Sequence, residues 1–268
     1  MSAIDTVFAQ LRQQKRKAFI PFVTAGDPNL DFTKALVAEL MQRGSSLCEI
    51  GIPYSDPIAD GPVIQASYTR ALNAGIRLED ILAAIREMAT TATAPMVTML
   101  SYAIVNRWGT ERYVDRAVAA GVAGAIIPDL PVEEAAPMAD ICRQRDFSLI
   151  QLVTPTTNRE RALRIAETST GFLYYVSVTG ITGERAELPQ GLVDEVGWLR
   201  AQTELPICIG FGISQVEHVR LLAPAADGVI VGSAIVRRIG DGAATDAGKT
   251  ISDIGEYAQT LIDALKSS

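Results

Sequence analysis

The acidic residue Glu49 lies within a short apolar segment that is typical of a buried β-strand. Its neighbours Cys48 and Ile50 are apolar, and successive side chains of a strand point to opposite faces. If Cys48 and Ile50 face the helices, Glu49 faces the interior, where loss of hydration raises the pKa of its carboxyl group. Such a group suits acid–base catalysis near neutral pH. The alternative, an ion pair with a basic strand residue, is disfavoured because the predicted strands contain no Lys or Arg.

Two further acids, Asp56 and Asp60, lie in the segment that follows this strand. Three prolines restrict residues 53–62, so both carboxylates can be held in place at a low cost in conformational entropy. Asp60 could instead cap the helix expected to begin near Val63. The combination of a buried Glu with two loop acids favours a catalytic role.

Glycine-rich segments follow the last two predicted strands. Gly210 and Gly212 come at and after the end of the seventh strand, and Gly232 with Ser233 follows the eighth. Glycines let a backbone approach an anion closely, and free N–H groups at a helix start bind its oxygens. In barrels of parallel strands and helices, phosphate commonly binds at these two places. Together the segments favour a phosphate-bearing substrate over the alternative of simple tight turns.

A third loop, residues 179–189, follows the sixth predicted strand and contains Gly180 and Gly183. Its glycines would allow the loop to close over a substrate as a lid that excludes water. An ordinary surface loop is the equally supported alternative.

These loops must be positioned by an alternation of strands and helices, which is typical of βαβ units around a parallel sheet. A doubly wound sheet is the competing fold, but residues 24–28 lack its glycine fingerprint. We therefore predict an α/β fold over residues 1–268, a single-domain (β/α)8 TIM barrel with inserted loops after strands 2 and 6. The predicted strands are 18–23, 46–52, 96–101, 124–128, 148–154, 172–177, 206–210 and 228–231, and the predicted helices lie near 31–43, 78–90, 109–120, 132–145, 158–167, 189–202, 214–222 and 251–266.

Two segments fall outside the eight units. Residues 2–13 have apolar residues at helical spacing and are expected to form an extra helix over the N-terminal mouth of the barrel. Residues 240–249 are polar and rich in Gly and Ala, which indicates a flexible connection to the last helix. The active site of such a barrel lies at the C-terminal ends of its strands.

Composition excludes several functional classes. The net charge of -7 disfavours nucleic acid as a partner, and the basic run 15–17 is short. Neither a signal peptide nor a membrane span is indicated, so we expect a cytoplasmic protein. Cys48, Cys142 and Cys208 are odd in number and far apart, which favours buried free thiols over disulfides or zinc ligands. A single histidine leaves no material for a His-based triad or a His-rich metal site.

The same motifs carry a family resemblance. The string 55–62 (SDPIADGP) is highly specific, and further matches lie at 21–28, Glu49, 128–131, 182–183, 210–214 and 232–236. Over nearly its whole length the chain resembles the α chain of tryptophan synthase. The resemblance implies retro-aldol cleavage of indole-3-glycerol phosphate to indole and glyceraldehyde 3-phosphate, with no metal and no cofactor in this chain.

The resemblance also implies roles for individual residues. Glu49 would shuttle protons between indole C3 and the adjacent hydroxyl, while Asp60 would stabilise the positive charge that develops on the ring nitrogen. The implied indole pocket is formed by Phe22, Leu100, Tyr102, Ile127 and Tyr174. The implied phosphate contacts are Gly183, Gly212, Gly232 and Ser233, with Thr182, Gly210 and Phe211 also in the substrate site.

By the same resemblance the chain would bind a β chain that contains pyridoxal phosphate, and would pass indole to it in an α2β2 assembly. Pro53, Asp56 and Pro57 would lie at that interface, and Asp56 with the Thr182 loop would carry signals between the sites. Ile104 departs from the family, because many relatives have Asn in that turn.

Three alternatives stay open at the level of sequence. A stand-alone indole-3-glycerol phosphate lyase would carry the same catalytic residues and release free indole. A phosphosugar isomerase or epimerase would share only the phosphate site. A degenerate barrel that regulates the β chain is disfavoured by the presence of Glu49 and Asp60.

Overall fold

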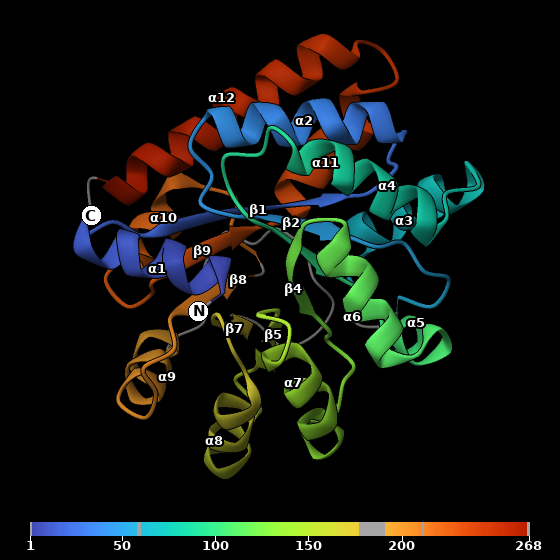
Figure 1. Cartoon of the computed structure of the whole chain (residues 1–268). Helices are drawn as coiled ribbons and strands as arrows, with labels where there is room; N and C mark the ends of the chain where they lie inside the picture. Colours follow the sequence, from blue (N-terminus) through green and yellow to red (C-terminus); the bar gives the residue numbers. More distant parts are fainter. Residues whose placement is uncertain (1, 58–59, 177–190, 211, 267–268) are drawn as a thin grey trace.

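The computed structural model describes residues 2–57, 60–176, 191–210 and 212–266. These ranges form a barrel of parallel strands surrounded by helices (Figure 1). The predicted inserted loops after the second and sixth strands fall partly on residues 58–59 and 177–190, outside the described residues.

The strands are hydrogen-bonded in the order β5-β4-β3-β2-β1-β9-β8-β7-β6. Only Gln151 separates β5 from β6, so both ends of the sheet belong to one interrupted strand and the barrel is nearly closed. This confirms the predicted TIM barrel, with β5 and β6 in place of the single strand predicted at 148–154. The strands are β1 Ala18–Thr24, β2 Cys48–Gly51, β3 Met96–Met99, β4 Val122–Ile126, β5 Ser148–Ile150, β6 Leu152–Val153, β7 Leu173–Val176, β8 Ile207–Gly210 and β9 Gly228–Val231.

Helices surround the sheet, and most lie close to their predicted positions. A short 3-10 helix, Val132–Glu134, replaces the start of the helix predicted at 132–145. The α-helices are α1 Ala3–Gln13, α2 Leu30–Gln42, α3 Pro62–Asn73, α4 Leu78–Ala89, α5 Tyr102–Trp108, α6 Thr110–Ala119, α7 Ala135–Arg143, α8 Arg159–Thr168, α9 Leu192–Arg200, α10 Val216–Leu222, α11 Ser233–Gly242 and α12 Ala247–Lys266.

Two local predictions were wrong. The strand predicted at 96–101 ends at Met99, because Ser101 caps α5 by accepting a hydrogen bond from the N–H of Ala103. The flexible connection predicted at 240–249 shrinks to residues 243–246 between α11 and α12. There the carboxylate of Asp246 accepts a hydrogen bond from the N–H of Lys249 at 2.9 Å, so the helix starts earlier than its Gly/Ala content indicated.

The first helix covers the N-terminal mouth of the barrel, as predicted. Ser2 and Asp5 form a capping box at its start. Ile4 and Phe8 pack into the apolar cluster of the barrel interior, where the Phe8 ring lies 5.7 Å from that of Phe172. The mouth opposite to the strand C-termini is therefore closed by apolar packing.

Buried side chains separate into an interior cluster and an outer layer between strands and helices. Ile20 and Val97 belong to the interior, while Ile50 belongs to the outer layer. The three cysteines, Cys48, Cys142 and Cys208, are buried and free, as predicted.

Candidate active site

Glu49 points into the barrel interior at the centre of the sheet. It pairs in register with Phe22 of β1 and Val97 of β3, and its side chain is 1 % exposed. Cys48 and Ile50 on either side pack in the outer layer. The alternation of the strand therefore places a carboxyl group among apolar interior residues, as the sequence predicted.

The carboxyl group of Glu49 is buried, and none of the ion pairs among the described residues includes it. Among the residues that the structure describes, neither of its oxygens has a hydrogen-bond partner. Burial, and secondarily the charge of Asp60, raises the pKa of Glu49 to about 8. At neutral pH the group is mainly protonated and can donate a proton.

Asp60 lies at the C-terminal mouth of the barrel beside Glu49. Burial, followed by the charge of Asp129, raises the pKa of Asp60 to about 6, although a hydrogen bond from the Tyr54 hydroxyl at 3.5 Å opposes the shift. The N-cap residue of α3 is Gly61, so the alternative role of Asp60 as a helix cap is wrong. At pH 7 Asp60 is mainly ionised, unlike Glu49, so the two groups differ in protonation state.

Helix α3 fixes the position of Asp60 relative to the barrel. The amide group of Gln65 donates hydrogen bonds to the carbonyl oxygens of Asp60 at 2.7 Å and Pro57 at 3.2 Å. Further along the helix, the Ser67 hydroxyl lies 2.7 Å from that of Thr24 at the end of β1.

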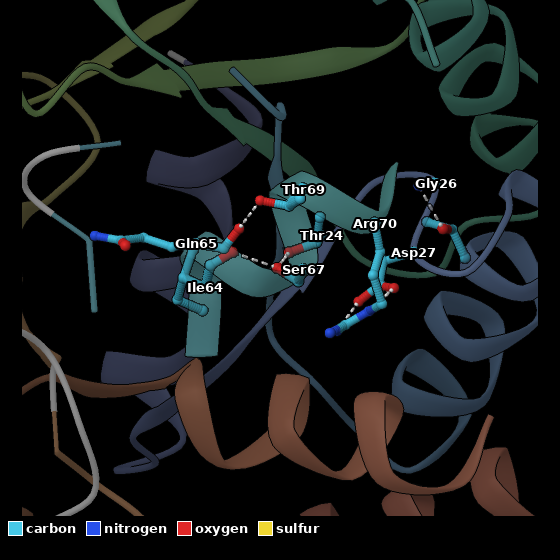
Figure 2. A network of polar contacts seen from close by, with 9 residues as sticks. Thr24, Gly26, Asp27, Ile64, Gln65, Ser67, Thr69 and Arg70 are labelled. Atoms are coloured by element: carbon cyan, nitrogen blue, oxygen red, sulfur yellow. Dashed lines mark hydrogen bonds and ion pairs between the residues drawn. The ribbon is translucent and has the colours of Figure 1, made fainter. Parts of the chain in front are cut away.

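An ion pair completes this attachment. Arg70 donates to both carboxylate oxygens of Asp27, at 2.8 and 2.7 Å, and Figure 2 shows the two side chains facing each other beside the contact between Thr24 and Ser67. Asp27 itself is 2 % exposed. Through α3, the loop that carries Asp60 is thus tied to β1.

A pocket at this mouth brings together half of the predicted catalytic and substrate-binding residues. Its lining includes seven predicted residues: Phe22, Glu49, Asp60, Tyr174, Gly212, Gly232 and Ser233. Three further lining residues, Ile64, Met99 and Ile213, were not predicted. Met99 could have been found from the alternation of β3, because it lies two residues after the interior residue Val97.

The remaining predicted residues lie elsewhere or outside the described chain. Leu100 and Ile127 are buried in the outer layer, and Tyr102 is partly buried at the start of α5. Gly210 ends β8, where an added Cβ would clash with the side chain of Tyr174, one of the residues that line the pocket. Thr182, Gly183 and Phe211 fall outside the described residues.

The glycine-rich end of the pocket has features suited to an anion. Gly232 is the N-cap residue of α11, and Ser233 is its first residue. The first N–H groups of a helix lack partners within it and attract negative charge. Gly212 has a φ of 80°, which glycine adopts without strain.

The predicted interface residues lie next to the pocket. Pro53 is buried, while Asp56 is exposed and accepts a hydrogen bond from the Ser55 hydroxyl at 2.7 Å. Pro57 is partly buried and held by Gln65. Ile104, the departure from the family, packs partly buried against the outer layer.

Comparison with known proteins identifies the family. The model of the family "Tryptophan synthase alpha chain" matches residues 8–266. The chain is 55% identical over 278 residues to the tryptophan synthase alpha chain of Rhodopirellula baltica, with 100% of both chains covered. The chain belongs to the tryptophan synthase α chain family.

Other relatives agree with this assignment. The tryptophan synthase alpha chain of Synechocystis is 43% identical over 98% of this chain and 100% of its own length. The crystal structure of the tryptophan synthase alpha chain from Legionella pneumophila superposes with a TM-score of 0.89 at 33% identity, covering 100% of this chain and 98% of the other. A structure of Mycobacterium tuberculosis tryptophan synthase also gives 0.89, at 31% identity and 98% coverage of both chains.

Membership of the tryptophan synthase α chain family confirms the resemblance seen in the sequence. The family consists of lyases that cleave indole-3-glycerol phosphate, so this activity is favoured over a phosphosugar isomerase or epimerase. Within the described residues, no helix has the length and apolar character needed to cross a bilayer.

Proposed function

We propose that Glu49 and Asp60 are the catalytic pair that cleaves indole-3-glycerol phosphate in this chain. One observation carries the proposal: Glu49 is a buried carboxyl group without a hydrogen-bond partner among the described residues, and it lines a pocket together with a second acid. Burying such a group costs stability, so its presence in a pocket indicates that function requires it. A retro-aldol reaction requires a group of this kind.

The different pKa values of the two acids assign their roles. Glu49, with a pKa of about 8, holds the proton that indole C3 must receive. Asp60, with a pKa of about 6, is ionised and accepts a hydrogen bond from the indole N–H, which stabilises the positive charge that forms on the ring. The Glu49 carboxylate then takes the proton of the adjacent hydroxyl as the carbon–carbon bond breaks, giving indole and the aldehyde. The proton taken from the hydroxyl group restores the neutral carboxyl group of Glu49, so the cycle balances without an added reactant.

The two ends of the pocket suit the two ends of the substrate. The rings of Phe22 and Tyr174, with Met99, offer apolar contacts to indole. Gly212, Gly232 and Ser233 offer backbone and hydroxyl groups to the phosphate. The phosphate contact of Gly183, which lies outside the described residues, remains a prediction from the sequence.

We further propose that the chain binds a tryptophan synthase β chain, which contains pyridoxal phosphate, in an α2β2 assembly. Support comes from the structural likeness to Mycobacterium tuberculosis tryptophan synthase. The exposed carboxylate of Asp56, between Pro53 and Pro57, is available for such an interface. A cytoplasmic location remains a prediction.

The catalytic assignment is tested by indole release from purified variants. We expect Glu49→Gln and Asp60→Asn to fold normally and to lose about 10²- to 10⁴-fold in kcat. Asp56→Asn is the matched control, because it neutralises an exposed acid of the same loop outside the pocket, and the isolated chain should keep its rate. Near-native rates in both test variants would overturn the assignment.

Dependence on the partner is tested separately. Indole release is measured with and without an added β chain. Strong activation supports the proposed complex, whereas equal rates favour the alternative of a stand-alone lyase.

A further inference from the structure

A second cleft lies at the opposite end of the barrel from the proposed active site. It lies between the C-terminal part of α1, the start of β1 and the segment that joins α9 to β8. Figure 1 shows α1 and α9 on the same side of the barrel, beside β8. The cleft has a volume of about 440 Å³ and is lined by Phe8, Leu11, Arg12, Lys15, Arg16, Lys17, Arg200, Thr203, Glu204, Leu205, Pro206 and Asp227.

The charge of this cleft is opposite to that of the whole protein. Five of its lining residues are basic and two are acidic, in a chain whose net charge is -7. The basic residues come from distant parts of the sequence, since Arg200 joins the run from Arg12 to Lys17. The fold therefore gathers positive charge at one place, where it attracts anions.

The two acids leave most of this positive charge uncompensated. Asp227 already accepts hydrogen bonds from Arg200 at 2.6 Å and from the N–H of Ile207 at 2.9 Å. Arg12 contacts Glu204 through the carbonyl oxygen, at 3.4 Å, and not through the carboxylate. Among the described residues, no carboxylate lies within ion-pair distance of Arg12, Lys15, Arg16 or Lys17.

The pKa of Lys17 is lowered by its surroundings in this cleft. Its side chain is half-buried at the start of β1. Burial lowers the pKa of Lys17, and the nearby positive charge of Arg200 lowers it further, although Asp227 acts in the opposite direction. A bound anion would supply the compensation that the described residues do not.

We propose that this cleft binds a small multivalent anion, a phosphate ester or a polycarboxylate, through Arg12, Lys15, Lys17 and Arg200. Phe8, Leu11, Leu205 and Pro206 form an apolar wall against which the carbon part of such a ligand can pack. The volume of the cleft suits a small molecule, and the negative charge of the rest of the protein repels an extended polyanion. This site is separate from the pocket at Glu49, because it lies at the N-terminal ends of the strands.

The test is an NMR titration of ¹⁵N-labelled protein with inorganic pyrophosphate and, in a second arm, with citrate. We expect saturable shifts at the amides of residues 12–18, 203–205 and 207. Tighter binding of pyrophosphate identifies a phosphate site, and tighter binding of citrate identifies a carboxylate site. Shifts confined to Gly232 and Ser233, or no saturable shifts with either anion, would overturn the proposal.

Substitutions separate this site from general charge effects. Lys17→Gln and Arg12→Gln should each weaken binding by about tenfold or more, because each removes one charge-assisted contact. Lys249→Gln is the matched control, since it removes the same charge from an exposed lysine of α12 paired with Asp253. Indole release should be unchanged in all three variants. Arg12 is exposed, so Arg12→Gln provides the test if Lys17→Gln fails to fold. Equal anion affinity of Arg12→Gln and Lys249→Gln would contradict the proposed contacts.

Discussion

Asp27 and Glu49 are two almost fully buried acids with opposite surroundings. Their exposed fractions are 2 % and 1 %, yet Arg70 donates two hydrogen bonds to Asp27, while Glu49 has no hydrogen-bond partner among the described residues. A paired acid can stabilise the structure, whereas an unpaired one costs stability and marks a functional site. Asp27 therefore holds the scaffold together, and Glu49 is available for chemistry.

The sharpest way to break this comparison is to measure stability against pH with and without Glu49. The pKa of Glu49 in the folded state, about 8, lies above the ordinary value of 4.5, so the folded state binds the proton more tightly than the unfolded state. The free energy of unfolding should therefore be highest below pH 4.5 as far as this group is concerned, fall as the pH rises to about 8, and then level off. The total change should be on the order of a few kcal/mol.

Urea unfolding of the wild type and of Glu49→Gln between pH 5 and 9 checks this expectation. Gln cannot ionise, so the variant should lose this part of the pH dependence and gain stability over the wild type toward pH 9. Parallel curves for the two proteins would show that Glu49 is not buried unpaired.

Substitution of Asp27 is expected to lower stability, whereas substitution of Glu49 raises it toward pH 9. Asp27→Asn removes the ion pair with Arg70 and weakens two charge-assisted hydrogen bonds, so the free energy of unfolding should fall by about 1–3 kcal/mol. Arg70 is partly exposed, which allows water to replace part of the lost contact.

The Asp27→Asn variant is tested by measuring the midpoint of urea unfolding and kcat. Asp115→Asn is the control, because Asp115 pairs with Arg145 on the surface and should change stability by less than about 1 kcal/mol. If Asp27→Asn lost as much activity as Glu49→Gln without losing stability, the division between scaffold and chemistry would be wrong.

Much of this comparison could be predicted from the sequence. Strand periodicity places Glu49 in the interior, because one apolar residue on each side fixes which face it occupies. The barrel follows from eight alternating units, and the glycine-rich end of the pocket follows from two glycine segments at known places of such a barrel. The function came from the specific motif at 55–62, since periodicity alone indicates only an acid–base group.

Contacts between distant segments could not be predicted in this way. Nothing in the pattern of residues 24–28 indicates that Asp27 meets Arg70, and the basic run 15–17 gives no sign that Arg200 joins it. The indole contacts that the family resemblance implies for Leu100 and Ile127 stay predictions, and both residues pack in the outer layer. The start of α12 was missed because a single side chain, Asp246, outweighs a Gly/Ala-rich composition.

The smallest expected effect concerns Gln65, which joins the two regions. Its amide group holds the carbonyl oxygens of Asp60 and Pro57, while its helix is tied to β1 through Thr24 and Asp27. Gln65→Leu keeps the size of the side chain and removes both hydrogen bonds. Asp60 should then be held less firmly, and kcat should fall by about tenfold, because catalytic groups act only in a narrow range of positions.

Gln65 is a positioning residue, so kinetics must be separated from stability. The KM should change little, because Gln65 does not line the pocket, and the free energy of unfolding should fall by only about 1 kcal/mol. Thr69→Ala is the control on the same helix, since among the described residues the exposed hydroxyl of Thr69 donates to one group, the carbonyl oxygen of Gln65. Two results would contradict this role of Gln65: an equal loss of kcat in Thr69→Ala, or a loss in Gln65→Leu that disappears under stabilising conditions. Either result would show that α3 contributes stability alone and that Asp60 does not depend on Gln65 for its position.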